Sequence, residues 1–485
     1  MSPYVLLFFV LGYFLLLLGV AWYTSRNSNN ESFFIGNKSS NWMLVAFGMI
    51  GTSLSGVTFV SVPGSVGSNA FAYFQIVIGY LIGYLVIAFV LLPLYYKLNL
   101  TSIYSYLQGR LGFKSYKTGA SFFLLSRTLG ATARLYLVVK ILQDAILSSM
   151  GVPFWVTTLI ILIMILLYTY EGGVKTIVFT DTLQTSFMLG GLVVCVLYIL
   201  YAMDLNFTSA MGAMQDKGYG TIFFTDPNSK LFFLKQIVAG AFITITMTGM
   251  DQEMMQKSIS VRTLRDSQKN IITLSIIMVV VIFLFLFLGG LLHLYGTEQG
   301  VTAVGDQLFP ELALNYMPTA VSIIFIIALI SALFPSADGA ITALTSSFCI
   351  DILGMQRKAA WDEARRKKIR QWVHLSVAAV FLLFVMVFYW IDDKSMIDVI
   401  LKVAAYTYGP LLGLFTFGII TKRQVNDALV PVVCILAPVL CYIIERYQQY
   451  IFGDFQIGLE LLIINGALTF LGLMLISKRA HPQIK

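Results

Sequence analysis

The stretch MIGTSLSGVTFVSVPGSVG, Met49–Gly67, combines glycines, hydroxyl residues and a proline inside an apolar segment. A bilayer offers the backbone no hydrogen-bond partners, so an interrupted helix is tolerated only where it is buried in protein or lines a cavity. The stretch therefore predicts a broken membrane helix whose freed carbonyls bind a cation and whose second half faces a substrate. Helix packing through small residues is the alternative interpretation. The clustering of the hydroxyls in one short run favours the broken helix.

The composition around this stretch is that of a protein with many membrane helices. Of the 485 residues, 58% are hydrophobic and 12% are charged, whereas soluble proteins carry about 25% charged residues. Four separated cysteines and three scattered histidines indicate neither a disulfide framework nor a histidine-based metal site. The sequence shows no nucleotide-binding loop and no convergent acid–base set, so we expect neither an ATP-driven pump nor an enzyme, and no cofactor.

About thirteen apolar segments approach the roughly 20 residues that a membrane helix needs. The first has neither the basic start nor the cleavage site of a signal peptide, so we expect it to be retained. The segments span residues 3–23, 42–66, 71–96, 118–148, 154–170, 179–203, 231–255, 271–295, 319–350, 371–391, 396–420, 425–445 and 457–477.

Basic residues concentrate in every second connection between these segments. With the N-terminus outside, most of the 32 lysines and arginines fall in connections that face the cytoplasm, Lys257 among them. The run KAAWDEARRKKIR, Lys358–Arg370, is expected to form an amphipathic helix at that surface. The net charge of +8 is thereby explained without nucleic acid. We predict a multi-pass plasma-membrane protein with a cytoplasmic C-terminus, and the short loops fit a bacterial inner membrane.

Two later segments also carry signals of interruption. GAFITITMTGMDQ, Gly240–Gln252, lies five segments after the first broken helix, and ALISALFPSADGAITALTSS places Pro335 and Gly339 inside an apolar span. Interrupted helices at corresponding positions of two halves are typical of inverted-repeat transporters.

Charged residues inside the predicted spans are candidates for function, because burying an unpaired charge costs several kcal/mol. Asp338 lies deep in a span, Asp181 lies at a helix start, and Arg127 and Arg134 share one helix face. An arginine pairing with Asp338 or Asp181 is the structural interpretation. The functional one is a guanidinium that binds a substrate carboxylate. Aromatic residues that could line or gate a pocket are Tyr73, Phe74, Tyr80, Tyr84, Tyr406 and Tyr408.

Five landmarks in order make the chain resemble the sodium:solute symporter family, which includes sodium–glucose, iodide, multivitamin, proline and sialic acid transporters. They are SFFIGNKSSNW (Ser32–Trp42), LPLYYKLNLTSIYSYLQGRLG (Leu92–Gly112), YEGGVKTIVFTDTLQ (Tyr170–Gln184), GMDQEMMQKS (Gly249–Ser258) and SADGAITALTSSFCIDIL (Ser336–Leu353).

The resemblance implies an all-α polytopic fold with a five-plus-five inverted-repeat core, whose first and sixth helices are broken. The implied division is a leading helix and cytoplasmic loop (1–41), a first repeat (42–203), an extracellular loop (204–230), a second repeat (231–420), and two trailing helices with a short cytoplasmic tail (421–485).

The resemblance also implies a principal sodium site between the first and eighth core helices. The family usually has adjacent hydroxyl residues there, whereas this chain has Pro335 before Ser336, which removes one oxygen. The matching positions are Gly51, Leu54, Ala332, Pro335 and Ser336.

A second sodium site of some family members matches Asp181, with two hydroxyl positions that are Asp338 and Gly339 here. Our hypothesis is that Asp338 replaces the lost oxygen and shares a cation with Asp181, since hard cations prefer oxygen ligands. A protonated Asp338 that gives proton coupling, or an Asp338–arginine pair, is the alternative.

The substrate contacts of the family match Ser53, Ser55, Thr58, Gln75, Arg127, Arg134, Thr244 and Tyr406. The tyrosine gate and the buried carboxylate of the sugar transporters align near Met247 and Val77, so a sugar-type site is not supported.

We predict a sodium-coupled secondary active symporter that imports a small organic anion, such as a monocarboxylate, a vitamin or a sialic-acid-like sugar. Its expected partners are the solute, sodium and the lipid bilayer, with no nucleic acid, and a monomer is compatible with the sequence. The alternative is a sodium- or proton-coupled symporter of a neutral sugar or polyol, and a channel or sensor is a remote third interpretation.

Overall fold

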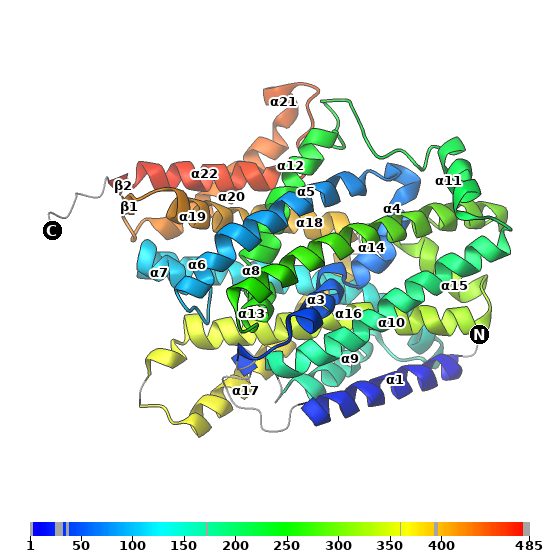
Figure 1. Ribbon diagram of the computed structural model, residues 1–485, viewed down its shortest axis with the longest axis horizontal. Helices are drawn as coiled ribbons and strands as arrows, with labels where there is room; N and C mark the ends of the chain where they lie inside the picture. Colours follow the sequence, from blue (N-terminus) through cyan, green and yellow to red (C-terminus); the bar gives the residue numbers. More distant parts are fainter. Residues whose placement is uncertain are drawn as a thin grey trace.

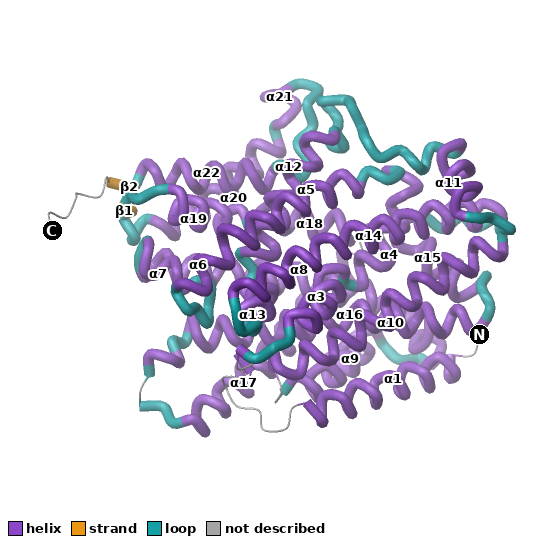
Figure 2. Tube along the Cα trace, viewed as in Figure 1, coloured by secondary structure: helices purple, strands orange, loops and turns teal. Residues whose placement is uncertain are grey.

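The computed structural model describes residues 3–24, 33–34, 38–170, 173–358, 360–391 and 396–478. Most helices run along the long axis of the molecule (Figure 1). Figure 2 shows that helices dominate these residues and that the two short strands lie together at one end. Most of the predicted loop after the first segment, and the predicted tail beyond Lys478, lie outside the described residues.

The helices and strands follow one another as α1 (Pro3–Thr24), α3 (Trp42–Leu54), α4 (Gly56–Asn69), α5 (Tyr73–Val86), η2 (Ile87–Leu91), α6 (Leu92–Lys97), α7 (Ser105–Arg110), α8 (Phe113–Leu142), η3 (Gln143–Leu147), η4 (Ser148–Met150), α9 (Phe154–Thr169), α10 (Gly173–Ala202), α11 (Phe207–Asp216), α12 (Phe233–Thr244), η5 (Ile245–Gly249), α13 (Gln252–Ile259), α14 (Leu264–Glu298), η6 (Gly305–Gln307), α15 (Leu308–Asn315), α16 (Thr319–Ser347), η7 (Phe348–Ile352), η8 (Met355–Arg357), α17 (Glu363–Ile391), α18 (Met396–Thr407), α19 (Gly409–Ile420), β1 (Gln424–Val425), α20 (Val430–Arg446), α21 (Gln448–Phe452), α22 (Leu461–Leu475) and β2 (Ser477–Lys478). The strands β1 and β2 pair antiparallel.

Each predicted membrane segment coincides with a helix or with a bent pair of helices. Over the described ranges, seven single helices are long and apolar enough to cross a membrane, and the number rises to ten when each bent pair is one span. The three remaining segments coincide with the shorter helices α9, α20 and α22. Apolar side chains on the outer face of α20, such as Val432, Leu436 and Val439, are exposed, as expected for contact with lipid.

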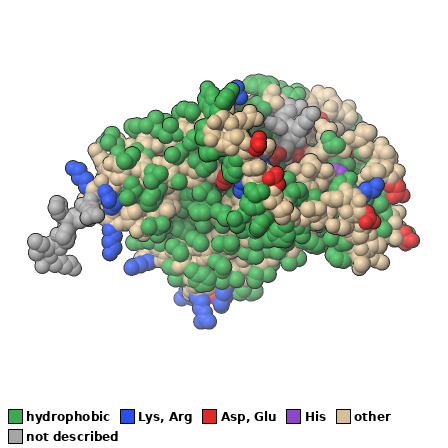
Figure 3. Space-filling view, turned by 90° about the horizontal axis from the view of Figure 1, so that it is seen from above, with side chains coloured by type: hydrophobic (Ala, Val, Ile, Leu, Met, Phe, Trp, Pro, Cys, Tyr) green, Lys and Arg blue, Asp and Glu red, His purple; other side chains and the backbone are tan. Residues whose placement is uncertain are grey.

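The two ends of the molecule differ in charge. In Figure 3, lysines and arginines gather at the left end and acidic side chains at the right, with a broad hydrophobic band between them. Figure 1 places the start of α1 at the right end and β2 at the left. This asymmetry has the form that the positive-inside rule requires, and the assignment of the basic end to the cytoplasm stays a prediction.

Both predicted broken helices are bent in the structure. The axes of α3 and α4 differ by 56°, with Ser55 between them, and the pair formed by α12–η5 and α13 is bent by 65°. Asp251 restarts the chain as α13, because its side chain accepts hydrogen bonds from the backbone N–H groups of Glu253 (2.9 Å) and Met254 (3.3 Å).

The other helices differ from the sequence expectations at three places. The ninth segment is not interrupted, because α16 continues through Pro335, whose ring removes a single helical hydrogen bond in a fully buried surrounding. The helix expected over Lys358–Arg370 is found in part, because its residues from Glu363 onward are helical but form the first turns of α17 and not a separate helix. A 45° bend between α18 and α19, at Tyr408, was not expected.

Glycines of the stretch Met49–Gly67 also pack closely against other elements, so the alternative interpretation, helix packing through small residues, is correct in part. A Cβ atom added to Gly56 would lie 2.3 Å from Val138 Cγ2, and one added to Gly64 would lie 2.2 Å from the Gly305 carbonyl oxygen. The same absence of a side chain lets α5 and α12 touch through their backbones. A Cβ on Gly79 would lie 2.0 Å from the Ile237 carbonyl oxygen.

Candidate functional site

A cavity of about 100 Å³ lies where α3 gives way to α4. The break contributes the hydroxyl groups, and α8 contributes two arginines that the seven-residue spacing places on one face. Its lining is formed by Thr52, Ser53, Ser55, Val57, Thr58, Tyr73, Tyr80, Tyr84, Arg127, Arg134, Ile243, Thr244, Met247, Thr248, Met254, Met278, Ile397, Ile400 and Leu401.

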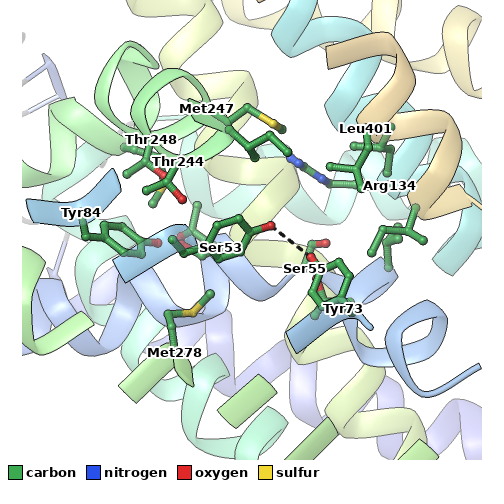
Figure 4. A pocket seen from close by; sticks show the side chains of 18 of the residues that line it. Ser53, Ser55, Tyr73, Tyr84, Arg134, Thr244, Met247, Thr248, Met278 and Leu401 are labelled. Atoms are coloured by element: carbon green, nitrogen blue, oxygen red, sulfur yellow. Dashed lines mark hydrogen bonds between the residues drawn. The ribbon is translucent and has the colours of Figure 1, made fainter. Parts of the chain in front are cut away.

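The two arginines differ in their partners. Arg127 is buried and forms an ion pair with Glu253 through its Nη2 atom. Arg134 is half-buried and pairs with no carboxylate among the residues that the structure describes. Figure 4 shows Arg134 beside Met247 and Leu401, on the side of the cavity that faces Ser55. The cavity thus contains one guanidinium whose charge is available to a ligand.

Tyrosines of α5 form another wall of the cavity. The hydroxyl groups of Tyr73 and Tyr80 lie 3.2 Å apart and are hydrogen-bonded, as the dashed line in Figure 4 shows, and Tyr84 lies on the same wall. Two further candidate aromatics have other partners: Tyr408 donates a hydrogen bond to Asp251 Oδ2 (2.7 Å), and the ring of Phe74 packs against Phe283.

Six of the eight predicted substrate residues line this cavity, and Gln75 and Tyr406 do not. The Gln75 amide donates to the backbone carbonyls of Ala72 (3.2 Å) and Leu231 (3.1 Å), so it fastens the loop before α12. The Tyr406 hydroxyl donates to Glu445 of α20. Sequence spacing does not fix the rotation of these helix ends, which explains the difference. The six that do line the cavity are Ser53, Ser55, Thr58, Arg127, Arg134 and Thr244.

The predicted principal sodium site is bounded by α3 and α16. A Cβ atom on Gly51 would lie 3.4 Å from Pro335 Cγ and 2.5 Å from Thr185 Oγ1, so these three residues meet. Thr185 Oγ1 is buried and has no hydrogen-bond partner among the described residues. The sequence reading missed Thr185, although it lies one helical turn after Asp181 and therefore on the same face.

Backbone carbonyls at this place lack their helical donors. Pro335 has no N–H group, so the carbonyl of Ser331 receives no hydrogen bond from it. The last carbonyls of α3, which ends at Leu54, are likewise free of helical partners. Of the other predicted ligands, Ala332 is buried three residues before Pro335, and the Ser336 hydroxyl donates to the carbonyl of Leu333 (2.8 Å). Free carbonyl and hydroxyl oxygens suit a hard cation.

A buried network of charges lies beside this place. The ammonium group of Lys257 lies 2.7 Å from Asp181 Oδ2 and 2.6 Å from Thr52 Oγ1, and 3.8 Å from Glu253 Oε1. Because Glu253 also pairs with Arg127, the network runs from Asp181 to the cavity. The expected pairing of an arginine with Asp181 or Asp338 is therefore not found, because Glu253 and Lys257 are the nearer partners.

Lys257 itself is a correction to the sequence reading, which placed it in a cytoplasmic connection. It lies in α13, where its side chain is only 3% exposed. The reason is the bend before α13, which turns this short helix back into the protein. The spacing of Glu253 and Lys257, one turn apart in GMDQEMMQKS, is the signal that could have shown them as a buried pair.

Asp338 is fully buried and lies in the same region. Its Oδ2 atom accepts a hydrogen bond from the Tyr168 hydroxyl (2.7 Å). Its other oxygen, Oδ1, and Oδ1 of Asp181 have no hydrogen-bond partner among the described residues. The two carboxylates and Lys257 interact electrostatically. A Cβ on the next residue, Gly339, would lie 3.2 Å from the Lys257 ammonium.

Comparison with known proteins places these features in a family. The Sodium:solute symporter family profile matches residues 33–430. The sodium/sialic acid symporter of Proteus mirabilis is 23% identical over 94% of this chain and 92% of its own length. The sodium-coupled monocarboxylate transporter 1 of Mus musculus is 22% identical over 81% of this chain and 64% of its own length.

Solved structures show the same fold. A Na+-coupled sialic acid symporter in a substrate-bound outward-open state superposes with a TM-score of 0.83 at 19% identity, covering 99% of both chains. A nucleobase-cation-symport-1 family transporter in a closed conformation gives a TM-score of 0.58 at 12% identity, covering 93% of this chain and 94% of its own. The expected fold class, an all-α membrane transporter with a broken-helix core, is confirmed.

Proposed function

Because this chain belongs to the sodium:solute symporter family, we propose that it imports a small organic anion together with sodium. The observation that carries the anion is Arg134, a guanidinium that lines the cavity without a carboxylate partner in the described part of the chain. A bidentate interaction with a carboxylate is the contact for which a guanidinium is best suited.

The second half of the broken helix supports the same assignment. Helix α4 begins at Gly56, next to the cavity-lining hydroxyls of Ser55 and Thr58. The N-terminus of a helix carries partial positive charge and free N–H groups, both of which favour an anion. The tyrosine and methionine side chains of the remaining wall suit the apolar part of the solute.

Monocarboxylates, vitamins and sialic-acid-like sugars all fit this description in charge. A cavity of about 100 Å³ favours the smallest of them, because one water needs about 10–15 Å³ on the same scale. A larger solute requires the cavity to widen when it binds. Relatives that are named for sialic acid and for monocarboxylates support both classes as members of the test panel.

For sodium we propose the place where α3 meets α16. Its ligands are the carbonyls at Gly51, Leu54 and Ala332 and those freed next to Pro335, with Ser336 as the predicted hydroxyl and Thr185 as an additional one. Sodium at this place joins the broken helix to α16, so its binding orders the half-helix that forms the solute site. This is how a cation raises the affinity for the solute without touching it.

The test is uptake by the purified protein in liposomes, with a panel of small carboxylates, vitamins, sialic acid and neutral sugars. We expect uptake of one anionic class only when an inward sodium gradient is imposed, and none when potassium replaces sodium. Thermal stability in detergent gives a second reading, since a ligand that binds the folded state raises it. Stabilisation by a neutral sugar alone, or uptake that ignores sodium, would contradict the proposal.

A further inference from the structure

The network around Lys257 contains the elements of a cation site, with an amino group in the place of the ion. The ammonium is bound by one carboxylate oxygen of Asp181 and one hydroxyl oxygen of Thr52, at 2.7 and 2.6 Å. Carboxylate and hydroxyl oxygens are also the ligands that a free hard cation selects. The lysine ammonium is a compact single positive charge, so among side chains it most resembles a bound monovalent cation.

Gly339 provides the room that this arrangement needs. Any side chain there would collide with the network, because a Cβ atom would lie 2.3 Å from Glu253 Oε1 and 3.2 Å from the Lys257 ammonium. The sequence reading aligned Gly339 with a hydroxyl that binds a second sodium in some relatives. In this chain the oxygen ligand is missing and the vacated space admits the head groups of Glu253 and Lys257.

The buried carboxyl groups around Lys257 outnumber the buried cationic side chains. Asp181, Asp338 and Glu253 supply three buried carboxyl groups, and Lys257 and Arg127 supply two cations. Oδ1 of Asp181 and Oδ1 of Asp338 lack hydrogen-bond partners in the described ranges, as does Oγ1 of Thr342, one turn after Asp338. Removal of the lysine would therefore leave unpaired oxygen ligands in a buried and more negative site, which is costly unless a cation enters.

We propose that Lys257 is a tethered cation that permanently occupies a second ion site, so that this symporter binds one sodium where a second would otherwise be taken up. The inference rests on the proposed function only for the one sodium that the wild type binds where α3 meets α16. Two successive ion pairs, from Lys257 to Glu253 and from Glu253 to Arg127, also connect the tethered charge to the wall of the cavity. The lysine therefore contributes to the electrostatic potential at the solute site.

The test counts sodium ions bound by the purified protein, with radioactive sodium and with thermal stability in sodium against potassium at constant ionic strength. We expect one ion for the wild type and two for Lys257→Ala, with a steeper sodium dependence. The double variant Lys257→Ala/Asp181→Asn should return to one, because it loses the carboxylate together with the lysine. Lys269→Ala is the matched control, since that side chain is 48% exposed and should leave the count unchanged.

Several outcomes would overturn the inference. These are two sodium ions bound by the wild type, or a folded Lys257→Ala protein that binds no more sodium than the wild type. If Lys257→Ala unfolds in potassium and is restored by sodium, the inference is supported. If it folds in neither salt, Lys257→Gln takes its place with the same expected gain. A wild type that binds no sodium while Lys257→Ala binds one would support the tethered cation and contradict the proposed sodium coupling.

Discussion

Arg127 and Arg134 illustrate how two residues that look equivalent in the sequence acquire different roles. They share a helix face and a cavity, yet Glu253 neutralises only Arg127. The spacing along the chain predicted their common direction and could not predict this partner, because α13 approaches α8 only through the fold. The same reason explains Lys257, whose burial depends on the bend before α13 and not on its neighbours in the sequence.

We expect Arg134→Ala to weaken anion binding by roughly 10- to 150-fold, since a hydrogen-bonded contact to a charged group contributes about 1.5–3 kcal/mol. Arg134→Lys should restore part of the affinity, because a point charge replaces the fork. The measurement is the dissociation constant of the solute identified in the uptake panel. Arg265→Ala, which removes an exposed arginine, is the control. Equal affinities in Arg134→Ala and Arg265→Ala would leave Arg134 without a role in binding.

Gly339→Ala should destabilise the protein by about 1–3 kcal/mol, because overpacking a buried site forces its neighbours to move. The added methyl collides with Glu253 and crowds Lys257. Thermal unfolding in detergent measures the loss. Gly190→Ala on α10, which meets nothing within 4 Å, should be neutral or slightly stabilising. Equal unfolding temperatures of the two variants would show that Glu253 and Lys257 can move aside without loss of stability.

At the scale of the elements, the chain's own signals predicted two of the three bends. The hydroxyl-rich run before Pro63 and the run ending at Asp251 coincide with real breaks. Pro335 was a misleading signal, because α16 continues through it in a buried surrounding. The bend at Gly409 carries a breaker signal as well, but only the structure shows Asn465 filling the space beside that glycine.

Pro335→Ala tests whether a freed carbonyl in α16 contributes to sodium binding. Alanine restores the N–H group that pairs with the carbonyl of Ser331, so the helix keeps its form while an oxygen ligand is lost. We expect a loss of sodium affinity of about fivefold, from about 1 kcal/mol for one ligand, with no loss of thermal stability. Pro438→Ala in α20, far along the chain from α16, makes the same change in a helix outside the site. If the sodium affinity is unchanged, the carbonyl of Ser331 is not a sodium ligand.

At the scale of the whole molecule, the charge asymmetry makes a prediction about orientation. The basic end carries β2 and the acidic end the start of α1, so the C-terminus should be cytoplasmic. A fluorescent protein that folds only in the cytoplasm, fused after the last residue, should be bright, and an alkaline phosphatase fused there should be inactive. The reverse pair of results would invert the assigned topology and with it the proposed direction of import.

The contact between α5 and α12 determines which parts of the molecule can move separately. At Gly79 and Gly240 the two backbones touch directly, without the layer of side chains whose rotamer changes allow helices to slide past one another. We therefore expect α5 and α12 to move together as one rigid body. Access to the cavity from the two sides of the membrane is then expected to alternate through movements at the bends beside Ser55 and Tyr408, and a cross-link between α5 and α12 should leave the transport cycle intact.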